Sequence, residues 1–80
     1  MNRKMIVRTL RQLYPYGTRV ELVQMDDPQA PPIGTKGSVL GVDDIGSIIV
    51  AWDNGSRLSV VYGEDVCRRV AEPGDQGQIQ

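Results

Sequence analysis

The chain has 80 residues, of which 40% are apolar, and its formal net charge is −1. A chain of this length forms one small domain, which buries only about 60–65% of the surface that its unfolded form exposes. It contains no histidine and a single cysteine, Cys67, which excludes a histidine-activated nucleophile, an internal disulfide and a cysteine-built zinc site. No apolar run approaches the roughly 20 residues that cross a bilayer. We therefore expect a cytoplasmic protein without a membrane partner, a metal or a cofactor.

The basic residues are unevenly distributed along the chain. Four of the nine, Arg3, Lys4, Arg8 and Arg11, lie within the first 11 residues, where there is no acid, whereas the rest of the chain holds five basic and ten acidic residues. Neutralised phosphates supply much of the affinity of nucleic-acid-binding proteins, which therefore present a basic face. Only the amino-terminal segment offers such a face.

The same segment is predicted to form a short amphipathic helix. Spacings of three and four place one apolar stripe along residues 3–13, made of Met5, Ile6, Thr9, Leu10 and Leu13. The helix should end at Tyr14, because the residue before a proline disfavours helical geometry. Two uses of the stripe remain open: packing on the rest of the domain, or docking on a second copy in a homo-oligomer. We expect a helix over 1–13, a β domain over 14–70 and a disordered tail over 71–80.

Residues 14–70 read as short strands joined by tight turns, since the interior must come from Val, Ile and Leu in a chain without Phe. Alternation and turn residues predict strands over 18–25, 37–42, 47–52, 57–62 and 66–70. Asn54-Gly55 predicts a type I′ hairpin turn with two positive φ angles. The fold class is therefore mainly β, a small five-stranded SH3-like barrel preceded by the helix.

The loop DDPQAPPIG, residues 26–34, is the predicted contact surface. Its three prolines fix φ, so the loop should be stiff and lose little entropy on binding. Exposed aromatic side chains on a neighbouring rim would extend it. The candidate partner-binding residues are Tyr16, Asp26, Asp27, Gln29, Pro31, Pro32, Trp52 and Tyr62. Trp52 has a second interpretation, as the anchor of the core.

Catalysis is not expected from this composition. The paired carboxylates, such as Asp43-Asp44, lie in predicted turns, where aspartate accepts backbone hydrogen bonds. A carboxylate-based hydrolase using Asp43 and Asp53 is the enzymatic alternative. Cys67 is expected to be a small buried residue, although Arg68 and Arg69 beside it would favour a lowered thiol pKa.

Four motifs together resemble a known family: YPYGTRV, MDDPQAPPIGTKGSV, VDDIGSIIVAWDNG and the following GED. They are similar to those of small domains of unknown function from bacteriophages and mobile elements. The resemblance implies a non-enzymatic protein that acts stoichiometrically, by blocking a host defence protein or by sequestering a nucleotide immune signal. An alternative is a nucleic-acid-binding accessory protein that uses Arg3, Lys4, Arg8 and Arg11.

Overall fold

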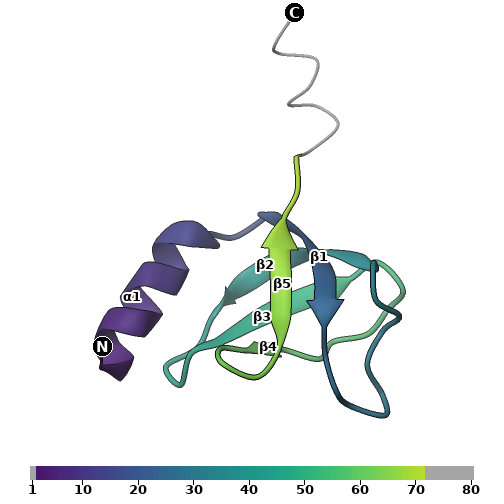
Figure 1. Cartoon of the computed structure of the whole chain (residues 1–80). Coiled ribbons are helices and arrows are strands. Elements are labelled where there is room, and N and C mark those ends of the chain that lie inside the picture. Colours follow the sequence, from purple (N-terminus) through teal and green to yellow (C-terminus); the bar gives the residue numbers. More distant parts are fainter. Residues whose placement is uncertain (1, 72–80) are drawn as a thin grey trace, which may run out of the picture.

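The computed structural model describes residues 2–71, as one helix followed by five strands (Figure 1). The elements are α1 (Arg3–Leu13), β1 (Arg19–Gln24), β2 (Lys36–Val42), β3 (Ser47–Trp52), β4 (Val60–Val61) and β5 (Val66–Arg69). The disordered tail was predicted over 71–80, and all of it beyond Ala71 lies outside the described residues. No helix within residues 2–71 has the length and apolar character needed to cross a membrane.

Helix α1 ends where its sequence predicts, at Leu13, but begins at Arg3, inside the predicted range of 1–13. The Asn2 side chain caps it by accepting a hydrogen bond from the Met5 amide at 2.9 Å. Tyr14 leaves helical geometry at φ −127° and ψ 64°, as expected before Pro15, while its amide still donates to Leu10.

The predicted apolar stripe of α1 is confirmed for Ile6 and Leu10 and wrong for Met5, Thr9 and Leu13. Val7 and Leu10 are the buried residues, and Ile6 is packed partly against the core. Met5 and Leu13 remain 50% and 41% exposed. The predicted stripe omitted Val7, which lies about one turn before Leu10. Val7 and Leu10 together face the barrel. The basic residues lie beside this buried pair, along the border between the helix and the barrel.

The strands form one antiparallel sheet in the order β4-β3-β2-β1-β5. Bulges at Val23 in β1 and Leu40 in β2 bend the sheet, and both of these side chains point outward. The sheet curls until β4 and β5, at its two ends, contact each other. The predicted mainly β, barrel-like fold is confirmed.

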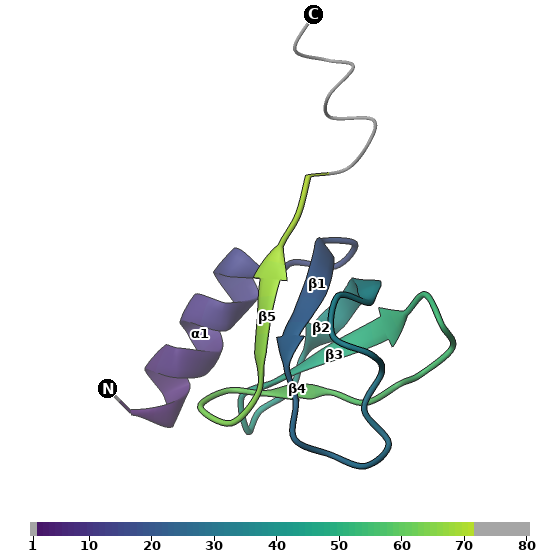
Figure 2. The same cartoon turned by 45° about the vertical axis from the view of Figure 1, so that its right-hand side comes forward.

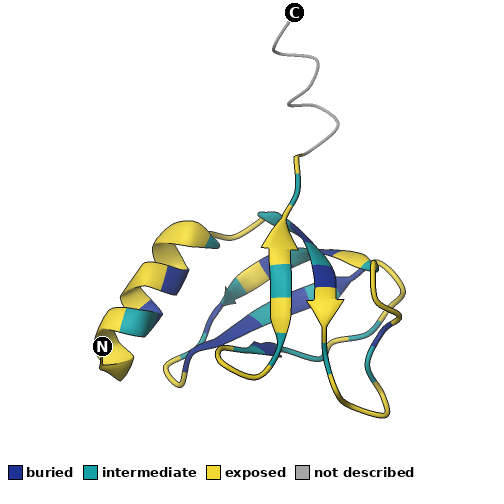
Figure 3. Ribbon diagram, in the orientation of Figure 1, coloured by how far each residue is buried: buried dark blue, intermediate teal, exposed yellow. Residues whose placement is uncertain are grey.

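The core fills the inside of this curl (Figure 3). Val20, Leu22, Val39 and Val50 are completely or almost completely buried, as the alternation in their strands predicts. Trp52 is 2% exposed, and its indole Nε1 donates to the Leu58 carbonyl at 2.8 Å. Trp52 is therefore the core anchor, and its assignment to the contact surface is wrong.

Two predictions about the β3–β4 connection are also wrong. The strand expected over 57–62 is reduced to Val60–Val61, because the Leu58 carbonyl is bound to Trp52 and the Leu58 amide faces Ser56 Oγ. Within residues 2–71 no residue other than glycine has a positive φ, so Asn54-Gly55 is not a type I′ turn. Instead Gly55, at φ 95°, donates to the Trp52 carbonyl and ends a four-residue turn.

Candidate functional site

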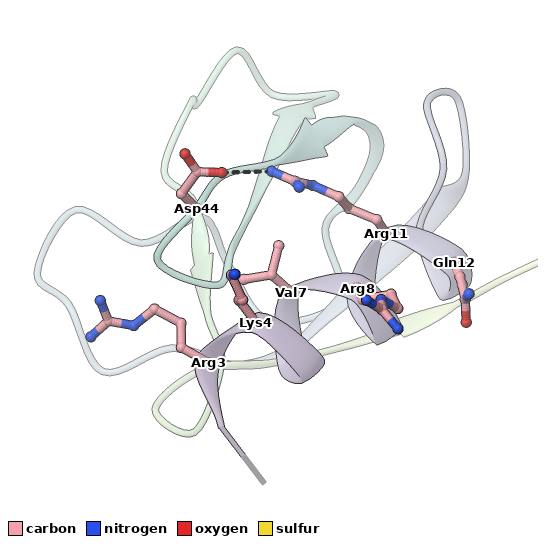
Figure 4. Close-up of a pocket in the computed structure, with 7 residues that line it drawn as sticks. All are labelled: Arg3, Lys4, Val7, Arg8, Arg11, Gln12 and Asp44. Carbon is pink, nitrogen blue, oxygen red and sulfur yellow. Dashed lines mark hydrogen bonds and ion pairs between the residues drawn. The ribbon is translucent and has the colours of Figure 1, made fainter.

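A hollow of about 730 Å³ lies between α1 and the turn that joins β2 to β3 (Figure 4). The helix supplies most of its wall, and Asp44 of the turn supplies the opposite side. Its lining residues are Arg3, Lys4, Val7, Arg8, Arg11, Gln12 and Asp44. All four basic residues singled out in the sequence therefore line the same hollow, with their side chains spread along the helix (Figure 4).

Arg11 holds the two walls together. Its guanidinium donates to the Val42 carbonyl from Nε at 3.1 Å and from Nη2 at 3.0 Å, and Nη2 is also 3.0 Å from Asp44 Oδ1. Asp44 is 95% exposed, so the ion pair alone contributes little, whereas the bonds to the carbonyl are partly buried. Arg11 thus fixes α1 beside the end of β2, an arrangement visible in Figure 1 and Figure 2.

The other three cations, Arg3, Lys4 and Arg8, have no hydrogen bond or ion pair from their side chains within residues 2–71, and all three are exposed. Lys4 and Arg8 are one helical turn apart, and like charges at this spacing destabilise a helix by about 0.2–0.5 kcal/mol. Arg8 and Arg11, three residues apart, form a second pair of neighbouring like charges. An anion bound in the hollow would relieve this repulsion.

The predicted loop surface is only partly exposed. Asp26, Asp27, Gln29 and Pro32 are exposed, but Pro31 is buried, so its assignment as a contact residue is wrong. The loop turns where the Asp27 side chain accepts from the Gln29 amide at 2.8 Å, and Pro31 is buried two residues after this turn. The loop contributes an exposed edge rather than a continuous aromatic patch.

The two exposed tyrosines are not part of that edge. Tyr16 precedes β1, whereas the 26–34 loop follows it, so the two lie at opposite ends of this strand. Tyr62 lies against Gly46 in the β2–β3 turn, at the far end of β2 from the loop. The contact surface predicted from Tyr16, the loop and Tyr62 is therefore divided, because both tyrosines lie toward the end of β2 that is opposite the loop.

The carboxylates serve the turns, as predicted. Asp43 Oδ1 accepts from the Ser47 amide at 2.8 Å, and Asp65 Oδ2 accepts from the Val61 amide at 2.9 Å. Asp53 instead pairs with Arg19, and this guanidinium holds the pKa of the Asp53 carboxyl below its usual range. Nowhere in residues 2–71 do three His, Cys, Asp or Glu side chains gather as a metal site.

Cys67 is partly buried against the core, close to Tyr14. Burial raises the pKa of its thiol from 9.0 to about 11, with a smaller opposing effect from the Tyr14 hydroxyl. The expectation that Arg68 and Arg69 lower this pKa is wrong, because both arginines are exposed and directed elsewhere: Arg68 to Glu21, and Arg69 to the Leu13 carbonyl. Burial therefore disfavours the thiolate form of Cys67.

The sequence alone identified the basic residues of the hollow but not Asp44, which forms the wall opposite them. Asp44 is 33 residues from Arg11, and its sequence context is that of an ordinary turn. Gln12 and Val7 carried no distinguishing pattern either. The absence of any acid from residues 1–11 was the only available signal.

Comparison with known proteins gives one result. A family model described as domain of unknown function DUF4314 matches residues 3–70, which include α1 and all five described strands. No curated protein matches the chain.

Proposed function

We propose that this chain, which belongs to the family of the domain of unknown function DUF4314, is a non-enzymatic protein that binds nucleic acid through its basic hollow. The single observation that carries this proposal is that Arg3, Lys4, Arg8 and Arg11 all line one hollow. Three of them have no acidic partner within residues 2–71, so their charge is available to phosphates.

The proposal accounts for the acidic remainder of the molecule. Outside α1 the acidic residues outnumber the basic ones, so the attraction is confined to one face. Binding should accordingly be local and should involve few phosphates. Three free cations predict a slope of about −2 to −3 in a plot of log affinity against log salt.

The test is fluorescence anisotropy with labelled oligonucleotides at low and moderate salt. We expect affinity to fall with salt and Arg8→Glu to weaken binding strongly. Arg57→Glu is the matched control, because Arg57 is also exposed but does not line the hollow. Both substitutions change the net charge equally. Absence of salt-dependent binding, or equal weakening by both variants, would contradict the proposal.

A free nucleotide offers the same phosphate chemistry as an oligonucleotide. Sequestration of a nucleotide immune signal is the form of this function that the family resemblance suggests. A thermal-shift measurement with mononucleotides and cyclic dinucleotides separates the two sources. A shift with nucleotides, but no anisotropy change with oligonucleotides, would select sequestration.

A second candidate function is blockage of a host protein by the 26–34 loop. It is favoured by the exposure of Ile33 at 61%, beside Pro32 and on a loop tied by hydrogen bonds at Asp27 and Thr35. Affinity capture from a bacterial lysate should then yield a protein that Ile33→Glu loses and Arg8→Glu retains. Identical captures by both variants would exclude this use of the loop.

The setting proposed for either function is the cytoplasm of a bacterium that carries a phage or mobile element. It rests on the motif resemblance, and gene neighbourhood tests it. Replication genes beside this gene would favour the nucleic-acid function, and anti-defence genes would favour blockage or sequestration.

A further inference from the structure

Asp44 is the only acid among the described residues that line the basic hollow, and it faces the helix from the turn between β2 and β3 (Figure 4). Its carboxylate does not serve this turn. The neighbouring Asp43 does so, by accepting from the Ile45 and Ser47 amides at 3.2 and 2.8 Å. Within residues 2–71 the Asp44 side chain has one partner, Arg11, whose Nη2 lies 3.0 Å from Oδ1. Asp44 therefore acts on the hollow through Arg11.

Arg11 does not depend on Asp44 to stay in place. Its Nε and Nη2 both donate to the Val42 carbonyl, at 3.1 and 3.0 Å, and these hydrogen bonds are partly buried. The hydrogen bond to Asp44 is exposed, so water and salt screen it far more. Within residues 2–71 the Nη1 group of Arg11 makes no hydrogen bond, and the Arg11 side chain is 52% exposed. A ligand can therefore reach the outer edge of the guanidinium, formed by Nη1 and Nη2.

A phosphate that binds Arg11 with two parallel hydrogen bonds needs this outer edge, because the Val42 carbonyl occupies the edge formed by Nε and Nη2. Asp44 occupies part of the outer edge, and two anions repel each other at contact distance. Resting on the proposed nucleic-acid function, we propose that Asp44 determines the affinity of the hollow by competing with the ligand for Arg11. Arg11 stays paired in the free protein and becomes the fourth cation of the site only when a phosphate displaces the carboxylate.

The experiment measures the binding of a labelled single-stranded DNA oligonucleotide by fluorescence anisotropy over a range of salt concentrations. Asp44→Asn removes the charge and keeps an oxygen that can accept from Arg11. We expect it to raise the affinity about two- to fivefold. It should also steepen the salt slope by about 0.7, the increment for one further phosphate on a single strand. Glu64→Gln is the matched control, because it removes the same charge from an exposed side chain that does not line the hollow. Its effect on affinity should be smaller, with no change in slope.

A second comparison shows whether Asp44 acts through Arg11. In an Arg11→Gln background, Asp44→Asn should change the affinity no more than Glu64→Gln does. A larger gain in that background would overturn the competition for Arg11. Circular dichroism shows whether Arg11→Gln still folds. If it does not fold, the comparison of Asp44→Asn with Glu64→Gln in the otherwise unaltered protein decides alone.

The direction of the Asp44→Asn effect separates competition from positioning. Unchanged or weaker binding would overturn the competition, and weaker binding would show that the carboxylate orients Arg11 for the ligand. An equal gain from Glu64→Gln would also overturn it and assign the effect to net charge. In each of these cases, salt-dependent binding by the unaltered protein would leave the proposed function standing. Failure of the unaltered protein and of every variant to bind the oligonucleotide would instead overturn the proposed function itself.

Discussion

At the scale of single residues, Gly37 has the least room to change. A Cβ at this position would lie 2.7 Å from Val50 Cγ1, 2.8 Å from the Ala51 carbonyl oxygen and 2.9 Å from Trp52 Cε3. The carbonyl belongs to the β2–β3 ladder and cannot move away without breaking it. Gly37→Ala should therefore lower the free energy of unfolding by about 1–3 kcal/mol in urea denaturation. Gly41→Ala, which meets no atom within 4 Å, is the control, and an equal loss there would contradict the steric argument.

The burial of Cys67 should make the stability of the protein fall at alkaline pH. Because burial raises the pKa of the folded thiol to about 11, the folded state prefers the neutral thiol more strongly than the unfolded state does. This contribution is complete below pH 9 and should be lost as the pH rises through 11. Alkylation of the native protein should likewise be slow at pH 8 and accelerate near pH 11. A Cys67→Ser variant should show a smaller decline in denaturation midpoint over this range; an identical decline would assign it to other groups.

At the scale of elements, the turn between β3 and β4 shows how a correct motif can adopt another geometry. The Asn54-Gly55 pair marks a reversal, but only Gly55 takes a positive φ, and Asp53 is held by Arg19 of β1. This tertiary ion pair, together with the hydrogen bond from the Gly55 amide to the Trp52 carbonyl, favours a turn over Trp52–Gly55 in place of the predicted type I′ turn. The choice between the two turn types depends on a strand more than 30 residues away, which no local motif records.

The turn geometry predicts the cost of altering Gly55. Gly55→Ala meets no atom within 4 Å, so its only cost is the left-handed backbone, about 1–2 kcal/mol of unfolding free energy. Gly55→Asn should cost less, because asparagine tolerates this region better. Thermal and urea denaturation of the two variants would measure the difference. Full tolerance of alanine would mean that the turn readily adopts another form.

At the scale of the whole molecule, α1 and the barrel share one core. Val7 and Leu10 are each 6% exposed and belong to the same cluster as Val20 and Trp52. We expect far-ultraviolet circular dichroism and Trp52 fluorescence to report one coincident unfolding transition. Leu10→Ala should lower the free energy of unfolding by about 2–5 kcal/mol. The midpoints reported by the two probes should fall together. Separate transitions would show that the helix is an independent unit.

This shared core also decides how the proposed site must be tested. Deletion of residues 1–11 would remove the cations together with Val7 and Leu10, so lost binding would not be distinguished from lost folding. Charge reversal at the exposed Arg8 avoids this, because the core stays intact. The homo-oligomer considered for the helix is not required to bury Val7 and Leu10, since the barrel already covers them.

The sequence by itself determined the end of the helix, the strands around Val20, Val39 and Val50, and the basic character of the first 11 residues. These properties follow from short-range patterns: periodicity, prolines and local charge. Only the tertiary structure decided which face of α1 is buried, that Trp52 and Pro31 lie inside, and that Asp44 lines the same hollow as the cations. Each of these outcomes depends on contacts between residues far apart in the chain, where packing and a few long-range hydrogen bonds select among arrangements that are locally equivalent.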